Sequence, residues 1–137
     1  MKQDPRAQIP GVDLSFGDGR YGRIWGVSGI DDLRGASFMK AASYLKQRAA
    51  QYGTFDWTIV VELDQVVSSA FKSLLNMMLA LDDTVAENPD RRSILIEWHV
   101  RKEDDNMSSI ADDVKDQTDQ RASKLKREGI QIKIVGR

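Results

Sequence analysis

Short alternations of apolar and polar residues near the start of the chain predict a β-hairpin. Apolar residues occupy every second position over 12–16, and apolar character returns over 21–27 after a Gly-Asp-Gly turn at 17–19. A turn of this kind between two such runs is typical of a hairpin. Residues 1–11 carry charge, glutamine and proline but little to bury, so we expect a flexible leader there and one ordered domain over 12–137.

Helical and strand patterns alternate along the rest of the chain. Apolar residues recur at helical spacing over three segments, and runs rich in β-branched residues lie between these segments. The run at 55–63 is almost continuously apolar, which predicts a central strand covered on both faces of the sheet. The expected helices lie at 36–51, 69–87 and 104–128, and the expected strands after the hairpin lie at 55–63, 93–100 and 130–135.

This order of elements predicts a single α/β domain. We expect a mixed β-sheet of about five strands, in which the N-terminal hairpin precedes parallel strands joined by right-handed helical crossovers. About three helices should flank this sheet. The helix at 104–128 has only a thin apolar stripe, so it should lie exposed on the flank of the sheet, with Gly129 as its stop.

Composition excludes several kinds of chemistry. The chain has no cysteine, which excludes disulfides, thiolate nucleophiles and thiolate metal sites, and its single histidine is His99. The formal net charge of −1 provides no overall attraction to nucleic acid or anionic membrane, so we expect neither as a partner. No apolar run approaches the roughly 20 residues of a membrane span, and we expect a cytoplasmic protein.

The junction between the strand at 55–63 and the following helix carries two serines, Ser68 and Ser69. A serine hydroxyl there could cap the helix by accepting a hydrogen bond from a first-turn N–H group. The same position suits a phosphate, because helix N-termini combine free backbone donors with partial positive charge. From the residues alone, plain capping is favoured and a phosphorylation switch is the alternative.

Acidic residues around His99 offer an enzymatic hypothesis. Glu97, His99 and the acids at 103–105 could form a small metal-dependent hydrolase site, since carboxylates bind hard cations and imidazole serves as a general base. However, no nucleophile or orienting acid stands beside His99 in the sequence. The acids at 103–105 are also favoured simply as first-turn residues of the next helix.

Several other motifs have a structural explanation that does not require a functional site. Residues 17–22 match the spacing G-x-G-x-x-G, but they lack the preceding strand and following helix of a phosphate loop, so we interpret them as the hairpin turn. Trp25, Trp57 and Trp98 lie in strands and are expected in the core. The pair Met77-Met78 indicates either core or an adaptable partner-binding face.

Three stretches resemble the SiaC family of regulatory phosphoproteins. They are Ser-Ser-Ala-Phe-Lys-Ser-Leu-Leu at 68–75, Ile-Glu-Trp-His at 96–99 and Glu-Asp-Asp-Asn-Met at 103–107. The serine turn after a buried strand is also similar to that of the STAS-like anti-sigma factor antagonists, although Val67 and Ala70 replace the aspartate and glycine of their motif. The chain is therefore identified as a divergent member of the SiaC family with a single STAS-like domain.

The resemblance implies a non-enzymatic partner-switching protein. It implies a phosphoacceptor at Ser68, with Ser69 as the alternative, that a serine/threonine kinase modifies and a PP2C-type phosphatase resets. The unphosphorylated form would bind and activate a diguanylate cyclase or another effector in c-di-GMP signalling and biofilm control, and no cofactor or metal is implied. A structural adaptor whose serines only cap is the third hypothesis. The expected partner-binding residues are Ser68, Ser69, Lys72, Asn76, Trp98 and His99.

Overall fold

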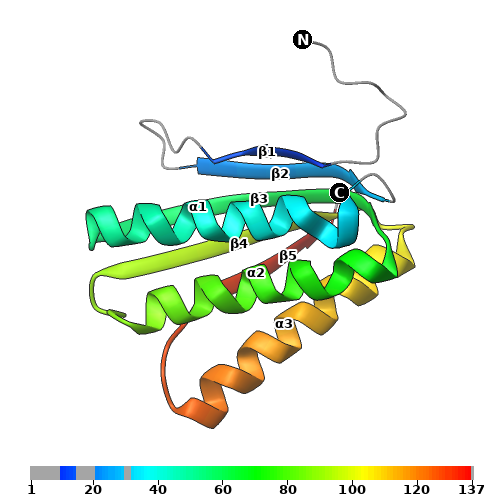
Figure 1. The fold of residues 1–137 in the computed structure, drawn as a ribbon. Coiled ribbons are helices and arrows are strands. Elements are labelled where there is room, and N and C mark those ends of the chain that lie inside the picture. Colours follow the sequence, from blue (N-terminus) through cyan, green and yellow to red (C-terminus); the bar gives the residue numbers. More distant parts are fainter. Residues whose placement is uncertain (1–9, 15–20, 30–31, 137) are drawn as a thin grey trace.

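The computed structural model describes residues 10–14, 21–29 and 32–136 of the 137-residue chain. Within them, the predicted order of two strands followed by three helix–strand pairs is confirmed (Figure 1). The hairpin turn at 15–20 and residues 1–9 of the predicted leader lie outside the described residues. The elements are β1 (Gly11–Asp13), β2 (Tyr21–Ser28), the 3-10 helix η1 (Leu33–Gly35), α1 (Ala36–Tyr52), β3 (Phe55–Val66), α2 (Ser68–Ala86), β4 (Arg92–Val100), α3 (Asp105–Leu125) and β5 (Gln131–Gly136).

All of these strands form one five-stranded sheet in the order β1-β2-β3-β4-β5. β1 pairs with β2 in antiparallel orientation, and the other neighbouring pairs are parallel. Figure 1 shows α1, α2 and α3 together on one side of the sheet. The mixed sheet predicted from the sequence is confirmed, with β3 at its centre.

Helices cover β3 on one face only, so the expectation of cover on both faces is wrong. Trp57 and Val61 are buried, whereas Asp56 is exposed and Glu62 is half-buried. Successive strand residues point to opposite faces, so the sheet has an apolar face under the helices and a more polar open face. The run looked continuously apolar because Val60 also lies on the open face.

Two boundaries differ from the expected ones. β3 continues to Val66 and therefore runs directly up to α2. α3 ends at Leu125, because Lys126 adopts the left-handed conformation with φ of 51° and closes the helix before Gly129. Gly129 is instead required for a close approach, since a Cβ atom there would lie 1.8 Å from Oδ1 of Asp82.

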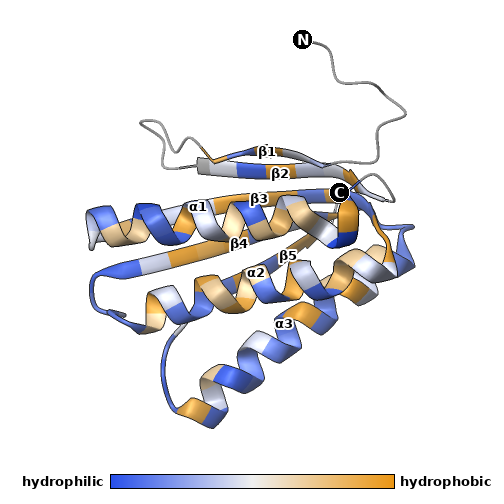
Figure 2. Ribbon diagram, viewed as in Figure 1, coloured by the Kyte–Doolittle hydropathy of each residue, from blue (hydrophilic) through white to orange (hydrophobic). Residues whose placement is uncertain are grey.

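The core lies between the helices and the apolar face of the sheet. Met77 and Met78 are both buried, so they belong to the core and not to a partner-binding face. Trp57 and Trp98 are also buried, whereas Trp25 is half-buried on the open face. α3 buries a stripe of four residues, and Figure 2 shows that hydrophilic residues predominate along much of this helix. The predicted exposed position of α3 on the flank is confirmed.

Candidate functional site

The start of α2 is held by the backbone and not by a serine side chain. Val67 is the N-cap residue in extended conformation, and no side chain caps the helix. Its carbonyl accepts hydrogen bonds from the N–H groups of Ala70 at 2.9 Å and Phe71 at 3.2 Å, and its own N–H donates to the carbonyl of Ser28 at 2.9 Å. The predicted capping role of the serines, on which the adaptor hypothesis rested, is therefore wrong. The physical reason is that β3 extends far enough to make Val67 the last extended residue.

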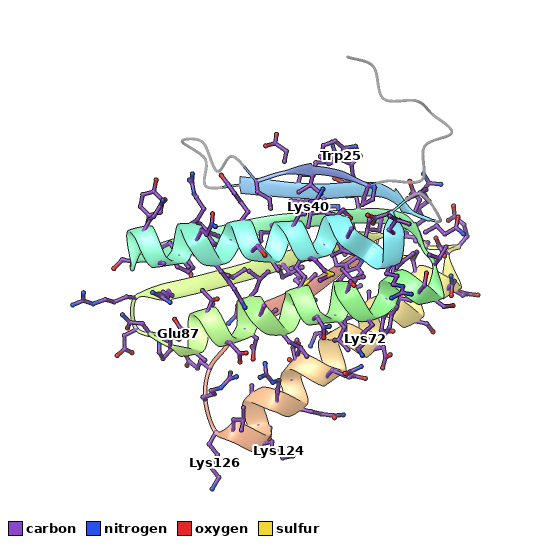
Figure 3. All side chains as sticks on the ribbon, viewed as in Figure 1. Trp25, Lys40, Lys72, Glu87, Lys124 and Lys126 are labelled. Atoms are coloured by element: carbon purple, nitrogen blue, oxygen red, sulfur yellow. The ribbon has the colours of Figure 1, made fainter. Side chains whose placement is uncertain are left out.

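Ser68 and Ser69 are both exposed in the first turn of α2, but they face different surroundings. Consecutive helical residues are rotated by about 100° about the helix axis. Ser68 lines a groove between α2 and α3. Ser69 shares its helix face with Lys72 and Asn76, which are exposed and follow it by three and seven positions. Lys72 is labelled on α2 in Figure 3.

The groove beside Ser68 is acidic and has a volume of about 650 Å³. Three aspartates of α3 line it, namely Asp112, Asp113 and Asp116, and no basic side chain among the described residues does. Phe71, one turn after Ser68, contributes apolar surface to the same groove. Sequence analysis missed these aspartates, although their spacing of i, i+1 and i+4 in a predicted helix places them on neighbouring faces. The structure thus puts the candidate phosphoacceptor at the edge of a negatively charged groove.

A lysine within the same stretch of α3 does not neutralise this charge. The ammonium of Lys115 lies 2.7 Å from Oδ2 of Asp119, one turn further along α3. The hydrogen bond and the charge of Asp119 raise the pKa of Lys115, and Asp116 and Asp112 add to the same effect. Lys115 is therefore charged but held by Asp119, and it does not line the groove.

Polar contacts fix the serine turn from the side of β2 and α1. The buried side chain of Asp32 accepts hydrogen bonds from the hydroxyl of Ser28 at 2.7 Å and from the N–H of Ser37 at 2.9 Å. On α2, the hydroxyl of Ser73 donates to the carbonyl of Arg34 at 2.5 Å. The loop before α1 is thereby tied to β2, to α1 and to α2, which positions the first turns of α2 relative to the sheet edge.

The six predicted partner-binding residues separate into three places. Trp98 is fully buried with 0% exposure, so its predicted contact with a partner is wrong. His99 lies on the open face of the sheet, with Nε2 3.0 Å from Oε1 of Glu97. The alternation of strand residues separates Trp98 from His99, and it was available in the sequence. The structure brings together only the four on α2, which are Ser68, Ser69, Lys72 and Asn76.

The residues of the hydrolase hypothesis do not converge. Glu97 and His99 are on the open face, Asp104 caps α3 through a hydrogen bond of 3.0 Å to a backbone N–H group, and Glu103 and Asp105 are exposed. None of them lines the acidic groove. Within the described part of the chain, no group of three or more His, Cys, Asp or Glu residues could hold a metal ion. The capping role of Asp104 supports the interpretation of these acids as helix-start residues.

Comparison with known proteins agrees with this fold. A sequence model described as SiaC family regulatory phosphoprotein matches residues 6–126. A chain in the crystal structure of diguanylate cyclase SiaD in complex with its activator SiaC from Pseudomonas aeruginosa has a TM-score of 0.70 at 11% identity, and the match covers 100% of both chains. The crystal structure of apo-SiaC from Pseudomonas aeruginosa has a TM-score of 0.70 at 12% identity, covering 98% of this chain and 97% of that chain. Comparison with curated proteins gives no match.

These two likenesses concern the fold, and they confirm the α/β class expected from the sequence. In the described residues, no helix is both long enough and apolar enough to cross a membrane. The family match extends over most of the chain and includes the serine turn, the groove residues and the strands β1 to β4. The chain therefore belongs to the SiaC family of regulatory phosphoproteins.

Proposed function

We propose that this chain is a non-enzymatic, cytoplasmic switch protein whose state is set by phosphorylation of Ser68. The observation that carries the proposal is that the Ser68 side chain is exposed at the start of α2 and has no capping role. A kinase could therefore modify the hydroxyl without removing a contact that holds the helix. First-turn N–H groups and the helix dipole favour the added negative charge at this end of α2.

The acidic groove explains how a phosphate on Ser68 would weaken the binding of a partner. Phosphorylation adds a charge of about −1.5 to −2. At Ser68 this charge joins Asp112, Asp113 and Asp116, which already line the groove. A partner that packs on Phe71 would have to desolvate the phosphate or approach four negative groups at once, so it binds the unphosphorylated form.

Family membership and the described complex of a relative support the choice of partners. SiaC of Pseudomonas aeruginosa is described as the activator of the diguanylate cyclase SiaD. By analogy, the unphosphorylated form of this chain binds and activates a diguanylate cyclase or a related effector of c-di-GMP signalling. A serine/threonine kinase and a PP2C-type phosphatase set its state. Ser69, Lys72 and Asn76 extend the docking surface along α2, and a contact at His99 stays a prediction.

The test compares charge and shape at position 68. Ser68→Asp should weaken binding to a diguanylate cyclase of the same organism by at least about tenfold, because it adds negative charge beside the acidic groove. Ser68→Ala should bind as the unmodified protein does. Isothermal titration calorimetry gives the affinities, and cyclase activity with each variant gives the functional effect. Equal binding by both variants would contradict the switch.

A matched variant decides between the two serines. Ser69→Asp carries the same charge one position later, on the face of Lys72 and away from the groove. We expect it to weaken binding less than Ser68→Asp does. Thermal unfolding of all variants controls for folding and should be unchanged, because Val67 caps α2 through its backbone. Intact-mass analysis after incubation with the cognate kinase identifies the modified position.

A further inference from the structure

The outer surface of α1 is basic, in contrast to the acidic groove beside α3. Between Leu33 and Phe55 the chain carries four basic residues and no acidic one. Lys40 and Lys46 are exposed and make no ion pair within the described part of the chain. Figure 3 shows Lys40 on α1, away from Lys124 and Lys126 at the C-terminal end of α3. This helix therefore concentrates positive charge on a protein whose formal net charge is −1.

Large apolar and aromatic side chains are exposed on the same helix. Met39 is 59% exposed, Tyr44 is 39% exposed and Tyr52 is 58% exposed. The guanidinium of Arg48 lies over both tyrosine rings, 5.7 Å from the centroid of Tyr44 and 5.1 Å from that of Tyr52. Its Nη1 also donates to the hydroxyl of Tyr44 at 3.3 Å. Stacking on two rings holds the arginine in one orientation before any partner arrives.

These side chains form a ridge with a shallow groove beside it. Residues at a spacing of four lie one above another on a helix. The ridge consists of Lys40, Tyr44, Arg48 and Tyr52. The groove has a volume of about 380 Å³ and is lined by Met39, Lys40, Ser43, Tyr44 and Gln47. It shares no lining residue with the groove beside Ser68.

We propose that this α1 surface, comprising Met39, Lys40, Tyr44, Lys46, Arg48 and Tyr52, docks an acidic α-helical segment of a partner protein. Charge complementarity favours an acidic partner, since every charged group of the surface is basic. A ridge beside a groove is the shape into which a second helix packs. Tyrosine, arginine and methionine are the residue types enriched at protein interfaces, and a pre-oriented guanidinium suits a carboxylate. The surface is separate from the Ser68 switch and does not depend on it.

The test uses a defined probe and the full chain. The probe is a fluorescein-labelled helical peptide built of Glu-Leu-Ala-Glu-Glu-Ala-Leu heptads, and its binding is measured by fluorescence anisotropy. The double variant Lys40→Glu/Lys46→Glu should weaken binding by at least about tenfold. The matched control Lys102→Glu/Lys124→Glu makes the same change in net charge at exposed lysines outside α1 and should bind within about twofold of the parent. An equal loss of peptide affinity in both double variants, or no loss of affinity in either, would overturn the proposal.

Further experiments distinguish a docked helix from other occupants of the α1 surface. Tyr44→Ala should weaken peptide binding even at a salt concentration that screens the charges, because the ring contributes apolar contact. Ser68→Asp should leave peptide binding unchanged, so this proposal can fail or succeed independently of the switch. Sedimentation of the parent with phosphatidylserine vesicles, in the absence of peptide binding, would identify a membrane surface as the occupant and overturn the proposal. Self-association of the parent that disappears in Lys40→Glu/Lys46→Glu would identify a second copy of this chain as the occupant and would also overturn the proposal.

Discussion

Asp82 connects the C-terminal half of α2 to α3 and to the start of β5. Its side chain is fully buried. Oδ1 accepts a hydrogen bond from the N–H of Ile130 at 3.0 Å, and Oδ2 accepts from Nη1 of Arg127 at 3.0 Å and from Nη1 of Arg121 at 3.4 Å. We predict that Asp82→Ala lowers the free energy of unfolding by about 3 kcal/mol.

The magnitude comes from the three contacts. A buried N–H group that loses its acceptor costs about 1–3 kcal/mol, and the Ile130 N–H meets this condition. The side chains of Arg121 and Arg127 are 31% and 21% exposed, so water can replace part of what they lose. They add about 1 kcal/mol together, well below the loss for a fully buried pair.

Asp83 provides the matched control. It is paired with the same two arginines, at 2.8 Å and 3.0 Å, but its side chain is 54% exposed. Asp83→Ala should therefore lower the free energy of unfolding by no more than about 1 kcal/mol. Urea unfolding followed by circular dichroism gives both values, provided that the m-values agree. If the two variants lose the same stability, burial of Asp82 does not decide its contribution and the reasoning is refuted.

Two further substitutions test other buried contacts. Gly129→Ala should lower the free energy of unfolding by about 2 kcal/mol or more, because the new Cβ would lie 1.8 Å from Oδ1 of Asp82 and must displace it; stability equal to the parent in urea would contradict this close approach. Asp32→Ala should lower it by about 2 kcal/mol, because the buried side chain of Asp32 accepts from Ser28 and Ser37. Asp32→Asn keeps an acceptor for the Ser37 N–H, so it should lower the free energy of unfolding less than Asp32→Ala does. A larger loss in Asp32→Asn would argue against the hydrogen bonds that we assign to Asp32.

Most of the fold was predictable because its patterns are local. Each helix and strand after the hairpin shows its own apolar periodicity, and the order of elements then fixes an α/β sheet. The cap of α2 was not assigned correctly, because strand ends are the weakest part of such a pattern. β3 runs on to Val66, which shifts the start of the helix onto Ser68 and leaves Val67 as the cap.

The sequence did not predict contacts between residues that lie far apart along the chain. Asp82 is separated from Arg121, Arg127 and Ile130 by 39, 45 and 48 positions, and no local pattern links them. The groove beside Ser68 likewise needs α3 to pack against the end of β3. Trp98 was correctly expected in the core, and strict alternation along β4, which places it with Ile94 and Ile96, would have removed it from the partner-binding residues.

The backbone cap at Val67 bears on how signalling by this chain can evolve. Because the helix start does not rely on a hydroxyl at position 68, serine, threonine or alanine there should differ little in folding. Under the proposed switch, changes at this position alter the response to a kinase without first producing a poorly folded protein. The proposed regulation could therefore be gained or lost by a single substitution at position 68, with little effect on the stability of the fold.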